Sequence, residues 1–225
     1  MNIRKITLVS LMILIALCLM SLCIGRYDVT ALNVIKLLLG STNDVIEYNL
    51  IVNIRLPRVI LVVISGGALA LAGMVFQSVF QNPLISPDVL GVTSGCSLGA
   101  AIGIVFMAAS NAIIQILSFS FGLVAVVFSL FLCNGMKNNK VLALIISGIV
   151  TSSIASSGVM IIKYFADPLK ELPAIDFWLM GGFYNSKWSN LKVVIPLVLI
   201  AVIIIFLFKW RLKILTMGED EAKLL

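Results

Sequence analysis

Long apolar runs separated by short polar stretches are the dominant pattern of this sequence. Nearly uncharged segments occupy about residues 6–25, 58–80, 91–109, 112–133, 141–163 and 191–209. A helix that crosses a bilayer needs about 20 apolar residues. Lipid offers no partner for an unpaired main-chain amide, so a spanning segment of this kind must be helical. The pattern therefore predicts an all-α polytopic membrane protein with about six transmembrane helices.

The longest uncharged stretch has to contain two of these helices. Residues 89–136 carry no charged side chain, and these 48 residues are too many for one span. Ser110-Asn111 is the most polar point near its middle and is the expected turn. No soluble domain, internal repeat or low-complexity tract is visible, so we expect residues 1–225 to form a single transmembrane domain.

Composition supports a membrane environment. The chain is 61% hydrophobic and 12% charged, whereas a soluble domain carries about 25% charged residues. The net charge of +6 comes from 16 Lys and Arg against 10 Asp and Glu. These basic residues flank the apolar runs, which indicates membrane anchoring rather than nucleic-acid binding.

The N-terminal run allows two interpretations. Arg4 and Lys5 precede the apolar residues 6–25, as they would in a cleaved signal peptide. The run is long for that role and Ser21–Gly25 is a poor cleavage site, which favours an uncleaved first helix. With the N-terminus in the cytoplasm, the 16 basic residues divide equally between the two sides. Those on the inner side lie in shorter segments, which favours this orientation.

Arg55 and Arg58 stand at the start of the second run, three residues apart. On a helix they would face the same way, and Pro57 suits a first turn because its missing N–H would be unpaired there. They are either arginines that reach for the membrane surface or a docking pair for carboxylates on an external partner, because a guanidinium can hold a carboxylate with two hydrogen bonds.

A proline-rich hinge follows the same run. Gln81-Asn82-Pro83-Leu84 and Pro87-Asp88 end the helix, because proline cannot continue the hydrogen-bond ladder and disfavours helix at the residue before it. The hinge is either a simple turn or a gate at the inner mouth of a pathway.

Glycines recur every four residues after the hinge, at Gly91, Gly95, Gly99 and Gly103. Small residues at this spacing form a groove of bare backbone that allows a neighbouring helix to approach closely. We assign these four glycines to helix packing.

Residues for bond chemistry are missing from the sequence. Histidine is absent, and the four cysteines lack the spacing of metal ligands. No phosphate-binding G-x-x-x-x-G-K-[ST] loop occurs. The sequence therefore predicts a non-enzymatic protein that holds no cofactor and no metal of its own. The interiors of the predicted spans carry no clear Asp, Glu, Lys or Arg. An ion-coupled secondary transporter usually keeps an ionisable residue there, so this alternative is weakened.

The ordered set of motifs resembles the FecCD-like permease subunits of ABC importers for iron–siderophore complexes and vitamin B12. The motifs that carry the resemblance, in order, are Arg55-Leu-Pro-Arg58, Gly66-Gly-Ala-Leu-Ala-Leu-Ala-Gly73, Gln77, Gln81-Asn82-Pro83-Leu84, Pro87-Asp88, Leu90-Gly91, Ser147-Gly148-Ile149, Trp178-Leu-Met-Gly181-Gly182, Trp188 and Gly218-Glu219-Asp220-Glu221-Ala222.

The resemblance implies a function and a set of partners. The chain would be a permease subunit in a bacterial cytoplasmic membrane, with a second permease subunit, cytoplasmic ABC ATPase subunits and an extracytoplasmic substrate-binding protein as partners. Iron–siderophore or a related metal chelate would be the cargo. Arg55 and Arg58 would meet acidic residues of the binding protein, and Asn82 and Leu84 would line the cytoplasmic gate. Gly218, Glu219, Asp220, Glu221 and Ala222 would begin the helix that couples to the ATPase.

Members of this family have ten helices and continue past the coupling segment. The resemblance therefore implies that the chain would correspond to the N-terminal part of such a permease, as a fragment, a truncated product or half of a split gene. The particular chelate and the identity of the second permease subunit, the same chain or a paralogue, stay open on the sequence.

Overall fold

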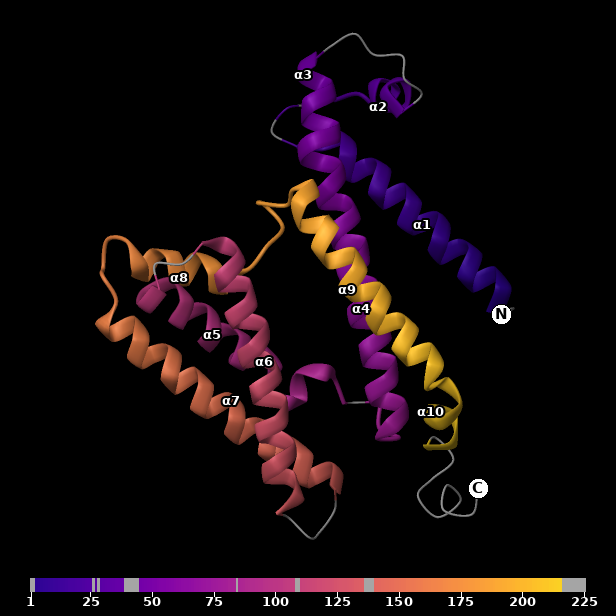
Figure 1. Cartoon of the computed structure of the whole chain (residues 1–225). Coiled ribbons are helices and arrows are strands. Elements are labelled where there is room, and N and C mark those ends of the chain that lie inside the picture. The colour runs from indigo at the N-terminus through magenta and orange to yellow at the C-terminus, as the bar shows by residue number, and fades with distance from the viewer. Residues whose placement is uncertain are drawn as a thin grey trace. The chain divides into compact units, whose positions relative to one another are not determined.

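The protein is described by a computed structural model that covers residues 3–25, 27, 29–38, 45–83, 85–107, 110–135 and 140–215. All regular secondary structure in these ranges is helical (Figure 1). The elements are α1 (Ile3–Cys23), α2 (Ala31–Leu38), α3 (Val45–Tyr48), the π-helical segment η1 (Asn49–Arg55), α4 (Leu56–Val79), the 3₁₀ helix η2 (Pro87–Leu90), α5 (Val92–Met107), α6 (Asn111–Asn134), α7 (Lys140–Phe165), α8 (Glu171–Met180), α9 (Trp188–Leu207) and α10 (Lys209–Leu215).

Each of the six expected apolar segments overlaps a helix, but the helices differ in length. Within the described residues, five helices are long and apolar enough to cross a membrane: Ile3–Cys23, Val45–Val79, Asn111–Asn134, Val141–Phe165 and Trp188–Leu207. The helix α5 is apolar but has only 16 residues, fewer than the number that usually spans the hydrocarbon core. Ser110, at the expected turn, has extended backbone, and α6 begins at the next residue, Asn111.

The second span begins earlier than the sequence suggests, because helix continues through η1 into α4. In η1 each N–H bonds to the carbonyl five residues back, as Leu56 N–H does to Ile51 O. Residue 57 would donate to Val52 O in this pattern, but Pro57 has no N–H. The indole Nε1 of Trp188 donates to Val52 O instead, at 3.0 Å. An aromatic side chain far along the chain thus satisfies the carbonyl that the proline leaves unpaired.

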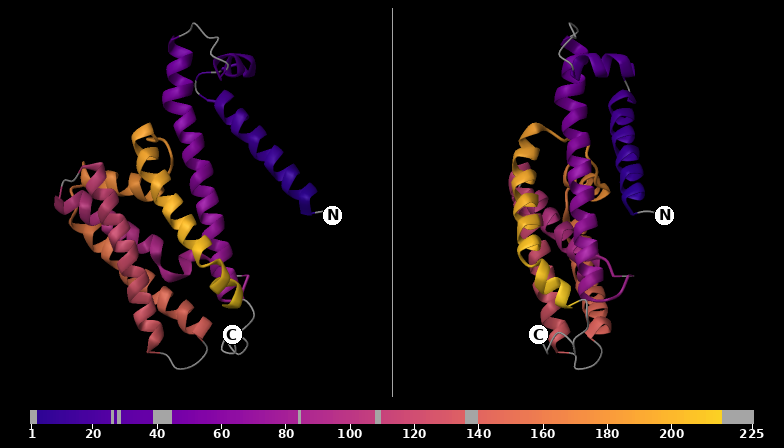
Figure 2. Two further views of the ribbon diagram at one scale, coloured as in Figure 1. Left: turned by 45° about the vertical axis from the view of Figure 1, so that its right-hand side comes forward. Right: turned by 90° about the vertical axis from the view of Figure 1, so that its right-hand side faces the viewer.

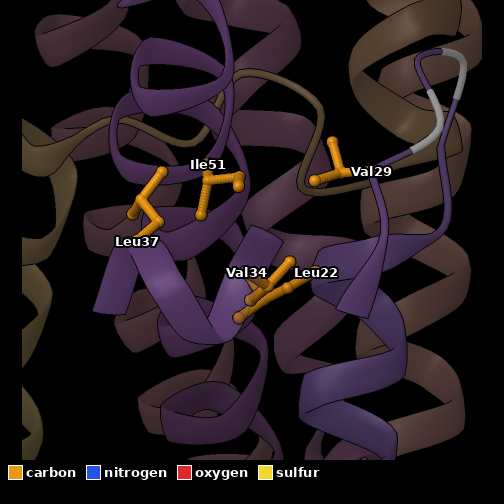
Figure 3. Close-up of a cluster of buried hydrophobic side chains, with 5 residues drawn as sticks. All are labelled: Leu22, Val29, Val34, Leu37 and Ile51. Atoms are coloured by element: carbon orange, nitrogen blue, oxygen red, sulfur yellow. The ribbon is translucent and has the colours of Figure 1, made fainter. Parts of the chain in front are cut away.

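The chain divides into two compact units. Unit 1 comprises residues 1–68 and 182–208, and unit 2 comprises residues 69–181 and 209–225. The single domain expected from the sequence stays a prediction. Unit 1 has a small core at the end of α1, made by Leu22, Val29, Val34, Leu37 and Ile51 (Figure 3).

Unit 2 is built on the helices α5, α6 and α7, which pack side by side (Figure 2). The helix η2 packs on α7, and α8 packs on α5 and α7. Ala101, Val159, Ile162, Ala166 and Ile175 form its apolar core. Most large apolar side chains outside the cores are exposed in both units, as expected of helices that face lipid.

Candidate functional site

Arg55 is buried, with 8% of its surface exposed. Its Nη1 donates to Leu22 O at 2.6 Å and to Cys23 O at 2.9 Å, and its Nη2 donates to Tyr27 O. The carbonyls of Leu22 and Cys23 belong to the last turn of α1, where carbonyls generally lack a partner within the helix; Cys23 O also accepts from Val29 N–H at 3.5 Å. The C-terminus of a helix also carries partial negative charge, which a cation stabilises. Arg55 therefore caps α1 and fixes the chain that leaves it.

Gly25 leaves the space that this cap occupies. A Cβ at residue 25 would lie 2.5 Å from Nη2 of Arg55, which is closer than a carbon and a nitrogen that are not bonded to each other can come. The position of the guanidinium thus depends on a residue without a side chain 30 positions earlier.

Arg58 is half-buried and has different partners. Its Nε donates to Phe183 O at 2.9 Å and its Nη2 to Tyr184 O at 2.7 Å, so it fixes the segment that precedes α9. A cavity of about 540 Å³ lies beside both arginines and is lined in part by Ser21, Tyr27 and Ile54. The two arginines predicted to form one docking pair therefore each hold main-chain carbonyls of a different segment. Their docking role stays a prediction.

The proline hinge is a short turn held by hydrogen bonds. Asn82 N–H donates to Gln77 O at 3.2 Å, and Gln77 Nε2 donates to Pro83 O at 3.1 Å. Gln81 has a φ of +48°, a left-handed conformation that is uncommon outside glycine. The predicted gate residue Asn82 lies in this turn, while Leu84 lies outside the described residues. Gly218, Glu219, Asp220, Glu221 and Ala222, the predicted coupling residues, also lie outside them.

The four predicted packing glycines contact two different helices. A Cβ at Gly95 would lie 2.6 Å from Ala125 Cβ, and one at Gly103 would lie 3.1 Å from Leu117 Cδ1. Gly99 likewise abuts the main chain of α6 at Leu117. Gly91 instead precedes α5 with φ +75°, and its nearest neighbours are Ser152 and Gly148 on α7.

Sequence reasoning missed a buried hydroxyl cluster on α6 and α7. Ser129, Ser147 and Thr151 are at most 4% exposed, and Ser129 reaches Leu90 O in η2. The available signal was a run of small polar residues inside two uncharged segments, which helix packing also explains.

Within the part of the chain that the structure describes, no group of three or more His, Cys, Asp or Glu side chains is close enough to hold a metal ion. The four cysteines are free thiols. The features that the site residues share are helix ends, hinges and helix contacts.

Long apolar helices, a proline hinge between α4 and α5, and polar residues at helix ends define a multi-pass membrane protein. The chain belongs to the FecCD transport family, whose model matches residues 13–225. The resemblance found in the sequence is thereby confirmed.

Individual relatives extend this comparison. The chain is 34% identical over 219 residues to the "Molybdate import system permease protein MolB" of Haemophilus influenzae, covering 95% of this chain and 64% of that protein. It is 35% identical over 173 residues to the "Probable iron chelatin transport system permease protein" of Helicobacter pylori, covering 77% of this chain and 52% of that protein. The chain thus spans less than two thirds of the length of these relatives.

A solved structure shares the fold. It is described as "An inward-facing conformation of a putative metal-chelate type ABC transporter" and aligns with a TM-score of 0.82 at 31% identity. The alignment covers 98% of this chain and 67% of that chain. The expected fold class, an all-α permease of the ABC importer type, is confirmed.

Proposed function

We propose that this chain forms the N-terminal part of the permease of an ABC importer, which moves a metal chelate or a related metal-containing solute into the cytoplasm. The observation that carries the proposal is the fold match over 98% of the chain to a metal-chelate type transporter, together with the family match over residues 13–225. The protein would supply a gated path by alternating access, and ATP hydrolysis would take place in a partner subunit.

The partners follow from this class of transporter. A cytoplasmic ABC ATPase would engage residues 218–222, an extracytoplasmic binding protein would dock on the outer face, and a second permease subunit would complete the path. Asn82 and Leu84 would line the inner gate. With the N-terminus in the cytoplasm, Arg55 and Arg58 lie at the outer end of α4, as docking requires.

The cargo is a metal-containing solute of broad class. Relatives of similar identity are named for molybdate and for iron chelatin, so identity alone does not choose between an oxyanion and a chelate. We propose iron–siderophore or a related chelate as the first cargo to test, because the matched structure is also of the metal-chelate type.

Uptake by a reconstituted complex tests the function. The tagged chain would be purified from its native membrane with the subunits that remain bound, and the complex placed in proteoliposomes with the binding protein. We expect uptake of radiolabelled iron–siderophore or molybdate that needs hydrolysable ATP. Uptake that follows an ion gradient and ignores ATP would contradict the proposal and favour a secondary transporter.

Docking by Arg58 can be tested apart from folding. Arg58→Gln removes the charge but keeps an N–H donor for the carbonyls of Phe183 and Tyr184, whereas Arg58→Lys keeps the charge. We expect Arg58→Gln to weaken binding of the binding protein about tenfold at low salt, with a smaller loss for Arg58→Lys, because opposite charges at an interface attract most at low ionic strength. Equal affinity for Arg58→Gln and the unchanged protein would remove Arg58 from the docking surface.

A further inference from the structure

Two buried hydroxyl groups in unit 2, those of Ser129 and Thr151, connect η2 to α6 and α7, while the Ser147 hydroxyl bonds Leu144 O on α7 itself. Ser129 lies on α6 and is fully buried, while Ser147 and Thr151 lie one turn apart on α7. Ser129 Oγ is 2.9 Å from Leu90 O, the last carbonyl of η2, and 2.7 Å from Thr151 Oγ1. Thr151 Oγ1 is 2.8 Å from Ser147 O. Three elements therefore meet at one hydroxyl.

The protons in this cluster do not suffice for all of its contacts. Ser129 and Thr151 carry one hydroxyl proton each, but they make three close oxygen–oxygen contacts. In one arrangement Ser129 donates to Leu90 O and Thr151 donates to Ser129. In the other, Ser129 donates to Thr151 and Thr151 donates to Ser147 O. Both arrangements pair both protons, but only the first holds η2.

A glycine on α7, Gly148, allows the main chain of η2 to pack directly against this helix. A Cβ at Gly148 would collide with the carbonyl of Val89, so the two main chains touch directly. Gly91 ends η2 in the left-handed region, with its α-carbon next to Ser152 and Gly148. Ile85 at the other end of the segment is 2% exposed. Residues 85–91 are therefore closely packed against α6 and α7.

We propose that the Ser129–Thr151 pair is a hydroxyl switch that positions the gate. When Ser129 donates to Leu90 O, residues 85–91 are held on α6 and α7, and the hinge residue Asn82 is held through the hydrogen bond from Ile85 N–H to its carbonyl at 3.3 Å. When Ser129 donates to Thr151, the segment is released and no buried donor is left unpaired, which keeps the cost of release low. Ser129 and Thr151 are positioning residues that act through η2, and their link to gating rests on the proposed permease function.

Two substitutions should shift this equilibrium in opposite directions. Ser129→Ala removes the donor to Leu90 O, so residues 85–91 should open more often. Thr151→Val keeps the shape of the side chain but removes the second acceptor, so release would leave the Ser129 proton buried without a partner. The segment should then open less often. Thr151→Ser keeps the hydroxyl and should behave like the unchanged protein.

Hydrogen–deuterium exchange of the full chain in lipid nanodiscs measures this opening. The reporters are the amides of Val89 and Gly91, which bond to Ser86 O and Asp88 O within the segment. We expect exchange there to be about fivefold faster in Ser129→Ala and about fivefold slower in Thr151→Val, given the usual worth of one buried hydrogen bond. Amides of α1, in the other unit, provide the reference for global stability.

The exchange rates distinguish a switch, in which the two substitutions have opposite effects, from hydrogen bonds that only stabilise the packing of residues 85–91. If Ser129→Ala and Thr151→Val both speed exchange, or if neither changes it at residues 85–91, the proposal is wrong. Faster exchange that extends equally to α1 would show loss of the fold and would also count against it. The exchange measurement needs no ATP, ligand or partner. A failed uptake assay would therefore contradict the permease function without affecting the exchange result, and a failed exchange experiment would leave the permease function untouched.

Discussion

At the scale of single residues, the partners of a side chain decide its role more than its place in a motif. Arg55 and Arg58 belong to one motif, yet Arg55 is buried on the end of α1 and Arg58 holds the segment before α9. A guanidinium suits such positions because its planar array of donors can bond several carbonyls at once. The motif therefore contributes to the structure of unit 1 whatever it binds outside.

Replacing Arg55 tests this structural role. Arg55→Lys should lower the free energy of unfolding by about 1–3 kcal/mol, because an ammonium cannot bond the three carbonyls in the same geometry and leaves buried acceptors unpaired. Arg58→Lys should cost less, since Arg58 is more exposed. Unfolding by SDS in mixed micelles measures both. Equal losses would show that burial of Arg55 does not matter.

Two glycines offer a matched pair on different helices. Gly148→Ala should destabilise the protein by about 1–3 kcal/mol, because its Cβ meets the main chain of Val89, which cannot rotate away. Gly66→Ala in α4 meets no atom within 4 Å, and alanine favours helix by up to about 1 kcal/mol over glycine. We expect a lower Tm for the first variant and an unchanged or higher Tm for the second, measured by thermal unfolding in detergent. A lower Tm in both variants would show that these positions need the backbone flexibility of glycine and not the absence of a side chain.

At the scale of elements, close helix contacts and short helix-end connections hold unit 2 together. Gly95, Gly99 and Gly103 let α5 approach α6, and η2 packs on α7 through Gly148. The helix α8 is attached in two ways. Ile175 is 1% exposed in the apolar core, and Asp176 forms an ion pair with Lys163 at 2.5 Å. Both groups of this ion pair are partly exposed, so water screens much of their attraction.

The two attachments of α8 should differ in energy. Ile175→Ala should cost about 2–5 kcal/mol, because it removes buried methyl groups and leaves a cavity. Asp176→Asn should cost at most about 1 kcal/mol, as exposed ion pairs usually do. The free energy of unfolding in mixed micelles tests both. An equal or larger effect of Asp176→Asn would mean that the ion pair, and not apolar burial, holds α8.

At the scale of the whole molecule, long apolar helices and the positions of charges fit a multi-pass membrane protein. Five of the described helices have the length and composition to cross a bilayer. The orientation follows from the weighting of basic residues toward short segments, and it stays a prediction.

Cysteine labelling tests the orientation. In a background with the four native cysteines replaced by alanine, Leu169→Cys and Trp210→Cys each offer an exposed position, at 88% and 69% exposure. With the N-terminus in the cytoplasm, a membrane-impermeant maleimide should label residue 169 on intact cells and residue 210 only after permeabilisation. The reverse labelling would place the N-terminus outside.

The sequence by itself determined that the chain lies in a membrane, where its main helices are and to which family it belongs. The length of an apolar run is a property of consecutive residues, so hydrophobicity alone located segments that overlap the helices α1, α4, α5, α6, α7 and α9. The motif order sufficed for the FecCD resemblance that the family model bears out. Proline also located the hinge, since its effect on the backbone is local.

Only the tertiary structure decided which groups meet. The hydrogen bond from Arg55 to Leu22 crosses 33 residues, that from Ser129 to Leu90 crosses 39, and that from Arg58 to Phe183 crosses 125. In η1, the carbonyl of Val52 likewise accepts from Trp188, which lies 136 residues away in sequence. The sequence does not distinguish one serine or glycine in an apolar helix from another, because the role of each depends on the residue that packs against it in the folded chain. A buried polar group needs a partner, and folding supplies that partner from a distant part of the chain.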